Sequence, residues 1–538
     1  MDDIHNLVAR VKEFFGKAVS KVAQTMYGNS LTKITDDSRI SLDPREYERI
    51  HRNKIYYSNH FPDIRYISSL KKAETRPFYS LNMTKTAARR IASICFNEKC
   101  DVNIGSLAVS QDESVEGNSN ANSDVVQDFV KQVLEDNDFK NKYETELEKG
   151  IALGDFAMRP YVDSTDHDKI KIAWIRADQF YPLKSNTNGV SEACIASVTV
   201  KSNANHSTTY YTLLEFHRWN RDSNGDHYVI DNELYRSDTP DVVGNQVPLS
   251  ECYEDIEPEV VIDGLSHPLF AYFKTPGANN KSLESPLGAG LVDNSREVLD
   301  AINITHDQFV REVKMGKRRI IVPEQMVKFD EVHKPTFDSD EDTFLSSNSE
   351  SDDFKPQDVT SDIRTQEYKD ALDRFIKEFE VQIGLSTGTF SQADSSGDVT
   401  ATQVVSDNSM TYQTRSSYLT MIEQSIKELV YAVVEIGSTG ELYTNGQAPL
   451  ASSVVDMDDL DINVQFDDGV FVDKKSQADY ITELLTAGLV PKWYAIMKVN
   501  DLPESEAKKW AEEINDETTA ATPETPFGEE ETTGGDDE

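Results

Sequence analysis

Apolar residues recur at helical spacing in two stretches near the middle of the chain. In the first, Leu291–Met315, steps of seven and four residues place one stripe along a helix: Leu291, Val298, Ile302, Phe309 and Val313. In the second, Ile363–Ile383, the stripe consists of Tyr368, Leu372, Phe375, Ile376, Phe379 and Ile383. At 1.5 Å per residue each helix is about 35 Å long, so the two can pack as an antiparallel pair. The same pattern fits an ordinary helical hairpin inside a soluble domain equally well.

The segment between these helices has a different character. Lys317–Pro323, with three basic residues before Ile-Ile-Val, predicts a strand, and residues 330–358 are acidic. A loop containing Gly384, Gly388 and Gly397 follows the second helix, and a third helical pattern runs from about Thr400 to Ile436. The pattern predicts helix, small strand-containing excursion, helix, loop and long helix.

The N-terminal half predicts helices followed by strands. Residues 4–26 form a basic amphipathic helix that can pack on a protein or lie on a membrane, Asn82 caps a second helix, and a third covers about 124–153 after a flexible insertion at 104–123. Short aromatic and β-branched runs then predict an antiparallel meander: 156–162, 170–174, 195–200, 210–219 and 228–235. Residues 222–226 suit a hairpin turn better than a calcium loop, because His227 stands where that loop needs glycine. The fold class is therefore α+β.

Beyond the third helical pattern, residues 461–472 predict a strand, and three short helices follow Asp473. Their helix-turn-helix spacing is a weak indication of DNA reading, because the surrounding residues are acidic. Residues 516–538 contain no Lys or Arg, are rich in acids, and predict a disordered tail.

Charge is distributed unevenly along the 538 residues. The whole chain carries 54 basic and 95 acidic residues, a net charge of −41. The first 100 residues carry 18 basic and 11 acidic side chains (+7), and the other 438 carry 36 and 84 (−48). A protein that binds DNA tightly by neutralising phosphates would be basic along its binding face. This composition favours a protein that avoids DNA, lets it slide, or meets it at small basic patches.

Sequence patterns of known catalytic chemistry are missing. There is no Walker A loop, no Gly-x-Ser-x-Gly, no His-Glu-x-x-His and no paired His/Cys cluster, so we expect no enzyme, metal or cofactor. Four cysteines in so long a chain make no disulfide framework and suit a reducing compartment. No apolar run is long enough for a membrane helix, and the N-terminus lacks the pattern of a secretory signal.

Several stretches, taken in order, resemble tailed-bacteriophage portal proteins of the A118/SPP1-type family, from phages of Gram-positive hosts. The resemblance covers roughly residues 40–515 and rests on these segments: Ser80–Met83 with Phe96–Lys99; Gly154–Tyr161 with Ala177–Pro182; Phe273–Pro276 with Asn279 and Asn280; Glu312–Lys314 with Gly316–Arg319; Thr400–Val404; and Phe466–Asp468 with Ala487–Leu489. No single segment is diagnostic, but their order is specific.

The resemblance implies a portal fold that assembles as a ring, commonly of twelve copies, at one capsid vertex. It assigns a β-rich wing (1–290), stem helices (291–316 and 363–384), a small α/β clip (317–362), a tunnel loop (385–399), a long wing-supporting helix with a return strand (400–472) and a helical crown (473–515). Its implied partners are the terminase large subunit, the head–tail adaptor, the major capsid and scaffolding proteins, and double-stranded DNA bound without regard to sequence. Such a protein is assembled in the host cytoplasm and resides in the virion.

Three sets of candidate residues follow. The stem would pack through Val298, Ile302, Phe309, Val313, Leu372, Phe375 and Phe379, and the tunnel loop would use Gly384, Thr387, Gly388, Ser391 and Gly397. Lys314, Lys317, Arg318 and Arg319 would contact DNA, or would pair with acids at a subunit interface. The alternative function is an acidic structural or scaffold protein without a DNA channel.

Overall fold

The computed structural model divides the chain into two compact units, residues 1–466 and 467–538. It describes residues 30–67, 72–97, 100–106, 116–186, 189–202, 208–222, 225–253, 256–316, 319–323, 343–347, 357–358, 362–391, 409–450, 457, 460–466, 474–500, 507–511 and 513–514. The helix predicted over residues 4–26 and the tail predicted over 516–538 lie outside these residues.

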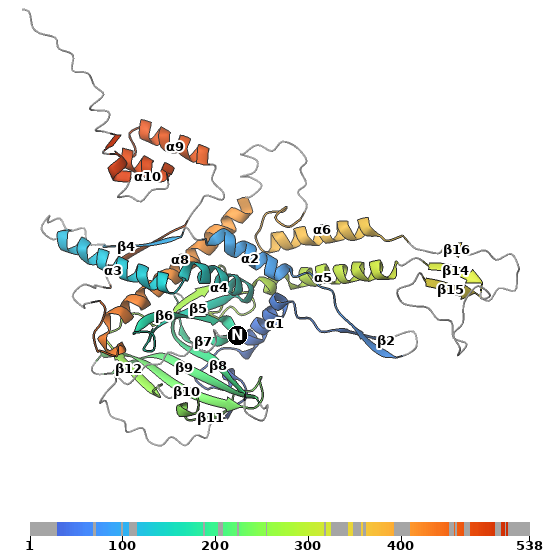
Figure 1. Ribbon diagram of the computed structural model, residues 1–538, viewed down its shortest axis with the longest axis horizontal. Coiled ribbons are helices and arrows are strands. Elements are labelled where there is room, and N and C mark those ends of the chain that lie inside the picture. Colours follow the sequence, from blue (N-terminus) through green and yellow to red (C-terminus); the bar gives the residue numbers. More distant parts are fainter. Residues whose placement is uncertain are drawn as a thin grey trace, which may run out of the picture. The chain divides into compact units, whose positions relative to one another are not determined.

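The largest sheet of the first unit has the strand order β1-β11-β10-β9-β8-β7, and β12 also pairs with β10 (Figure 1). Its strands are β1 (Ser30–Leu31), β7 (Phe180–Ser185), β8 (Val190–Ser202), β9 (Thr208–Asp222), β10 (Gly225–Ser237), β11 (Gly244–Val247) and β12 (Glu259–Asp263). Every pairing within it is antiparallel, as the alternating pattern predicts. Asp222 pairs with Gly225, which confirms the predicted hairpin between β9 and β10.

The first two strands of the predicted meander belong to a separate sheet, which corrects the prediction of one continuous sheet. β5 (Asp155–Asp163) lies between β6 (Lys169–Arg176) and β13 (Ala271–Lys274). The physical reason is burial on both faces of β5. Ala157 packs toward Phe180 and Ile195 of the large sheet, whereas Phe156 and Met158 pack into the helical core.

Three helices and a small strand pair cover that core. They are α2 (Met83–Cys95), α4 (Phe139–Leu153) and α8 (Ser409–Ser438), with β4 (Asp101–Ser106) paired to β17 (Leu460–Gln465). The predicted cap of α2 is confirmed, because the side chain of Asn82 accepts a hydrogen bond from the Lys85 amide at 3.2 Å. Tyr143 of α4 and Ser425 of α8 share a buried hydrogen bond of 2.9 Å, which joins two helices of this layer that are far apart in the sequence.

The single helix predicted over 124–153 is wrong. The structure has α3 (Glu116–Asp136) and α4, separated at Asn137 and at Asp138, whose φ is +50°. The buried side chain of Asn137 donates to the Ile170 carbonyl and accepts from the Ile172 amide, each at 2.9 Å. These tertiary bonds to β6 break the helix, and α3 begins inside the segment predicted to be a flexible insertion.

The central stretch folds as the periodicity predicts. α5 (Leu291–Met315) and α6 (Thr365–Gln382) lie side by side and antiparallel (Figure 1). The chain between them contains β14 (Arg319–Pro323), which pairs in parallel with β15 (Thr343–Ser347) and antiparallel with β16 (Gln357–Asp358). The strand predicted at Lys317–Pro323 is thus confirmed over Arg319–Pro323.

A helix and a strand pair lie in residues 44–76, where the sequence pattern predicted no element. α1 (Pro44–Ser58) begins after Asp43, whose side chain accepts a hydrogen bond from the Arg45 amide. β2 (Ile64–Ile67) and β3 (Ala73–Arg76) then form an antiparallel strand pair that joins no other sheet.

The second unit, described by itself, is helical. α9 (Lys474–Thr486) and α10 (Lys492–Asn500) are separated by Gly488, whose φ of +70° suits a glycine that ends a helix. Residues 507–511 are also helical. Ile481, Ala495 and Ala507 form its buried centre.

Candidate functional site

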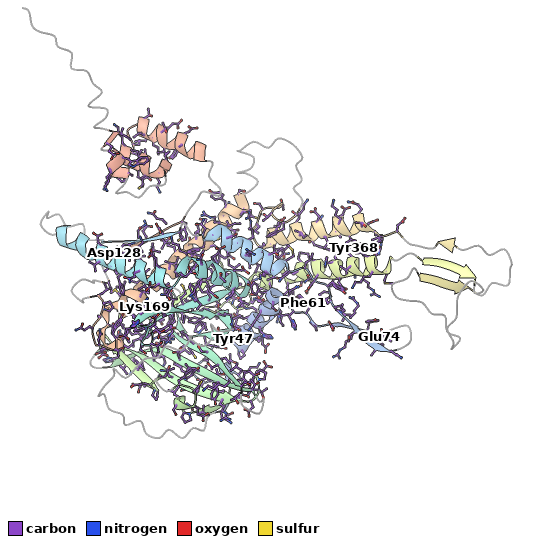
Figure 2. All side chains as sticks on the ribbon, viewed as in Figure 1. Tyr47, Phe61, Glu74, Asp128, Lys169 and Tyr368 are labelled. Carbon is purple, nitrogen blue, oxygen red and sulfur yellow. The ribbon has the colours of Figure 1, made fainter. Side chains whose placement is uncertain are left out.

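The most distinctive structure of the chain is the α5/α6 hairpin. The rings of Phe309 and Tyr368 lie 5.3 Å apart, and Figure 2 labels Tyr368 on α6. Arg364 binds Glu312 at 2.7 Å where the two helices join the excursion. The carboxylate of Glu312 accepts hydrogen bonds from the side chain and backbone of Arg364, which lowers its pKa to about 2. Closer to the body, an apolar cluster contains Val292, Val298, Leu299, Ile302, Leu372, Phe375, Ile376 and Phe379.

All seven predicted stem-packing residues lie on α5 or α6, and six of them are packed within the hairpin whereas Val313 is exposed. Val313 is 46% exposed, because α5 extends beyond Ala87 of α2, which covers the same face near Ile302. The predicted stripe also missed Leu299, which is 1% exposed. The buried face of α5 is therefore rotated toward α2 relative to the predicted stripe.

Apolar side chains are exposed along the outer faces of the hairpin. Ile304, Val313 and Met315 of α5 are 46–52% exposed, and Ile363 and Val381 at the two ends of α6 are 37% and 50% exposed. Contiguous apolar surface marks a contact with another molecule, whereas a single exposed apolar residue is ordinary. The hairpin therefore has apolar surface available for a partner.

The root of the hairpin is a buried network of charged and polar groups. Arg49 of α1 donates to Glu46 at 3.0 Å, to the Gly288 carbonyl at 2.9 Å, and to Asp293 in the first turn of α5. Asn53 donates to Asp293 at 3.1 Å. Arg49 and Glu46 are 5% and 4% exposed and the Asp293 side chain is 3% exposed, so α5 is joined to α1 by a buried network of ion pairs and hydrogen bonds.

Glycines allow the backbone to pass through this root. A Cβ at Gly288 would lie 2.1 Å from the Gly154 carbonyl oxygen, and a Cβ at Gly290 would lie 2.4 Å from the Asn53 side chain. The Thr275 amide donates to the same Gly154 carbonyl at 2.9 Å. The start of β5 and the entry to α5 are therefore in direct backbone contact.

Asp155 lies beside this contact and is completely buried. One carboxylate oxygen accepts hydrogen bonds from the Gly288 amide and the Tyr272 hydroxyl, each at 3.2 Å, and the other has no hydrogen-bond partner. Burial raises the pKa of Asp155 to about 7, although Arg49 opposes the rise. Asp155 is thus a titratable group at the base of the hairpin.

Two segments that carried the family resemblance meet at this root. Asn279, 7% exposed, donates to Glu46 at 2.7 Å and to the Leu287 carbonyl at 3.2 Å, and Gly154-Asp155 make the contacts above. Sequence analysis missed Glu46, Arg49 and Asp293, since their spacing follows no apolar period. Gly154-Asp155 and Asn279 both lie in segments on which the family resemblance rests, and this was the one sequence signal that connected them.

Of the four residues in the predicted basic cluster, Lys314 is the one whose side chain the structure describes. Its ammonium group bonds to the Tyr79 hydroxyl and lies 4.2 Å from the centre of the Tyr79 ring. Lys317 and Arg318 lie outside the described residues, and Arg319 begins β14, where the structure describes backbone alone. Lys314 is therefore packed against the chain's own surface in this structure.

The first part of the predicted tunnel loop is fixed in place. The fully buried carboxylate of Glu380 accepts hydrogen bonds from the amides of Gly388 (3.1 Å), Phe390 and Ser391 (2.9 Å) and from the Ser391 hydroxyl (2.7 Å). Gly384 has φ +78°, and its carbonyl accepts from Thr414 of α8 at 2.6 Å. Thr387 is exposed, and Gly397 lies outside the described residues. Residues 384–391 are therefore held to α6 and α8 by hydrogen bonds in this structure.

Two negative findings concern the described residues. No three His, Cys, Asp or Glu side chains among them gather as metal ligands. Each helix in this part of the chain is too short or too polar to cross a lipid bilayer.

A family model described as "Phage portal protein, SPP1 Gp6-like" matches residues 36–520, which include the hairpin, its root and most of the second unit. No curated protein matches the sequence.

Proposed function

The chain belongs to the SPP1 Gp6-like family of phage portal proteins, and from this premise we propose that it assembles as a ring, of about twelve copies, that conducts double-stranded DNA through one capsid vertex. In this proposal α5 and α6 are the stem, residues 317–362 the clip, 385–399 the tunnel loop and 473–515 the crown. The wing comprises residues 1–290, supported by α8 and β17.

The observation that carries the proposal is the apolar surface on both outer faces of the hairpin. Ile304 and Met315 on α5 and Ile363 and Val381 on α6 are exposed in the isolated chain. A ring gives each copy two neighbours, one on either side, so both faces become buried. The buried root supports this assembly because it holds every stem at the same angle to its body.

Charge supports the conduit. Duplex DNA carries about one negative charge per 1.7 Å, so a stem of about 35 Å surrounds roughly twenty phosphates. A strongly basic lumen would hold this DNA and stall its movement, whereas chains of net charge −41 repel it. In a ring of twelve, even Lys314 alone would supply about twelve positive charges, and Lys317, Arg318 and Arg319 would add to them.

The proposed partners follow from the position of a portal in the virion. The clip would contact the terminase large subunit during packaging and the head–tail adaptor afterwards, and the wing would contact the major capsid and scaffolding proteins. The protein acts structurally in this proposal, with the DNA movement driven by the motor it binds.

Electron microscopy of the purified full-length protein tests the proposal. Rings with a central opening are expected. Compact monomers or solid rods at assembly concentrations would contradict it, and would favour the acidic scaffold protein that the charge also allows.

A further inference from the structure

Little of the β2–β3 hairpin is covered by the residues that the structure describes. Each of its residues is exposed or half-buried, and Ile67 is 78% exposed. An isolated two-stranded hairpin is marginally stable at best in water. Some further surface must therefore cover it in the assembled protein.

One face of this hairpin is directed at α5. Arg76 makes two hydrogen bonds to Asp307, at 2.7 and 2.6 Å, and Asp307 also accepts from the Tyr79 amide at 3.2 Å. Tyr66 bonds to Glu74, which raises the Tyr66 pKa, and Arg311 of α5 is close enough to oppose that rise. Tyr66, Glu74 and Arg76 thus mark the α5-facing side of the strand pair.

The opposite face is open. Side chains alternate along a strand, and the register pairs Arg65 with Thr75 and Ile67 with Ala73. These four residues therefore share the face turned away from α5. All four are exposed, and this outward face combines an apolar tip at Ile67 with a cation at Arg65.

The β2–β3 hairpin and α6 lie on opposite sides of α5. Asp307 and Arg311 meet the hairpin, whereas Phe309 and Glu312 meet α6. At 100° per residue, Asp307 and Phe309 point about 160° apart around the helix axis. The order across the stem is therefore β2–β3 hairpin, α5, α6. One outer face belongs to the β2–β3 hairpin and the other to α6, and a head-to-tail ring joins two such unlike faces.

The outward face of the β2–β3 hairpin and the exposed face of α6 lie at a similar height along α5, and they carry opposite charges. Gly316 of α5 lies against Ile363, and Phe309 lies against Tyr368, so the level of Asp307–Met315 on α5 corresponds to Ile363–Asp370 on α6. At this level the exposed residues include Ile363 just before α6, and Glu367, Lys369 and Asp370 on α6, so the acidic side chains outnumber the lysine. Copies in a closed ring share one height, so the β2–β3 hairpin of one copy lies near the level of residues 363–370 of the next.

Resting on the ring proposed above, we infer that the outward face of the β2–β3 hairpin docks on the outer face of α6 of the next copy. Ile67 packs on Ile363 of that copy, and Arg65 pairs with its Glu367. Each hairpin gains the apolar cover it lacks, and each α6 gains a cation opposite its acidic face.

Cross-linking tests the apolar contact. The full-length double variant Ile67→Cys/Ile363→Cys, oxidised after assembly, should give covalent oligomers up to the ring size on a denaturing gel. Each single variant should give none beyond the wild type, whose cysteines are buried or half-buried. The control pair Ile67→Cys/Leu283→Cys uses a residue that is 81% exposed outside the stem, and it should not cross-link.

Charge exchange tests the polar contact. Arg65→Glu and Glu367→Arg should each raise the concentration needed for half-maximal ring formation about fivefold, the scale of an exposed ion pair. The double variant should return it to the wild-type value. Circular dichroism should be unchanged in all three, because both positions are exposed.

The outcomes separate this inference from the proposed function. Wild-type rings that neither cross-link at these positions nor respond to the charge changes would overturn the docking while leaving the portal role standing. A wild-type protein that forms no ring would overturn both.

Discussion

Arg49 and Asp293 form a buried ion pair that joins α1 to the first turn of α5, across 244 positions of sequence. Removal of one partner would leave the other charge buried and unpaired, which costs about 3–5 kcal/mol. We therefore expect Arg49→Ala and Asp293→Ala each to lower the free energy of unfolding of the first unit by that amount in urea titrations. Lys184→Ala removes a pair whose lysine is 68% exposed and should change it by less than about 1 kcal/mol. Equal effects of the three variants would contradict the assigned role of the root.

Close backbone packing gives the second prediction. Gly288→Ala places a Cβ 2.1 Å from the Gly154 carbonyl, so the entry to α5 must shift, at a cost of about 3 kcal/mol or more. Thermal unfolding should show a clear loss of stability. The matched control is Gly189→Ala, since nothing lies within 4 Å of its Cβ position. A Gly288→Ala variant as stable as the control would show that this backbone contact is absent.

Asp155 gives a prediction about pH. Its folded-state pKa, about 7, is raised above the ordinary value of 3.8, so its contribution to stability is greatest at low pH and is lost as pH rises through about 7. Between pH 5.5 and 8 this loss amounts to roughly 2 kcal/mol. Asp155→Asn does not titrate, and its stability relative to wild type should rise by that amount over this interval. Asp128→Asn, at an exposed position on α3, should keep the wild-type pH profile.

The Glu380 carboxylate gives a prediction about the loop after α6. Glu380→Ala would leave the amides of Phe390 and Ser391 without their acceptor, and we expect these two amides to exchange with deuterium far faster. The unfolding free energy should fall by roughly 3 kcal/mol. Glu378→Ala, which removes an exposed pair with Arg374, should leave exchange in the loop unchanged. Unchanged exchange in Glu380→Ala as well would mean that other contacts hold the loop.

The exposed stem residues give a prediction about assembly. Val313→Asp and Ile304→Asp place charges on apolar surface that the proposed ring buries, so ring formation should weaken at least tenfold while the monomer keeps its melting temperature. Sedimentation velocity measures both states. Leu283→Asp is the control, since Leu283 is 81% exposed outside the stem. Normal assembly of both stem variants would remove these faces from the interface.

Local pattern was sufficient to predict the helices and strands whose burial is apolar. α5 has the predicted bounds, α2 has the predicted cap, and β8, β9 and β10 alternate as antiparallel strands do. α1 could not be found in this way. Four of its residues are buried, and Glu46, Arg49 and Asn53 are polar, so Ile50 is the one apolar residue among them. A helix buried through ion pairs has no hydrophobic period to detect.

Tertiary contacts decided the rest. The break between α3 and α4 follows from bonds that Asn137 makes to β6, about 35 residues away, and no local pattern encodes them. The root combines Glu46, Arg49, Asp155 and Asp293, which sequence alone could not bring together. Val313 shows the same limit, because it continues the predicted stripe and is nevertheless 46% exposed.

The contact between Gly154 and Gly288 has a mechanical consequence. Two main chains that touch directly have no rotatable side-chain bonds between them to absorb strain, so this joint is stiff. A force applied at the far end of α5 would be transmitted to β5, and through β5 to the interior of the first unit, with little side-chain rearrangement to absorb it. The α5/α6 hairpin is thus rigidly connected to β5, and its motions would have to be shared by the whole first unit.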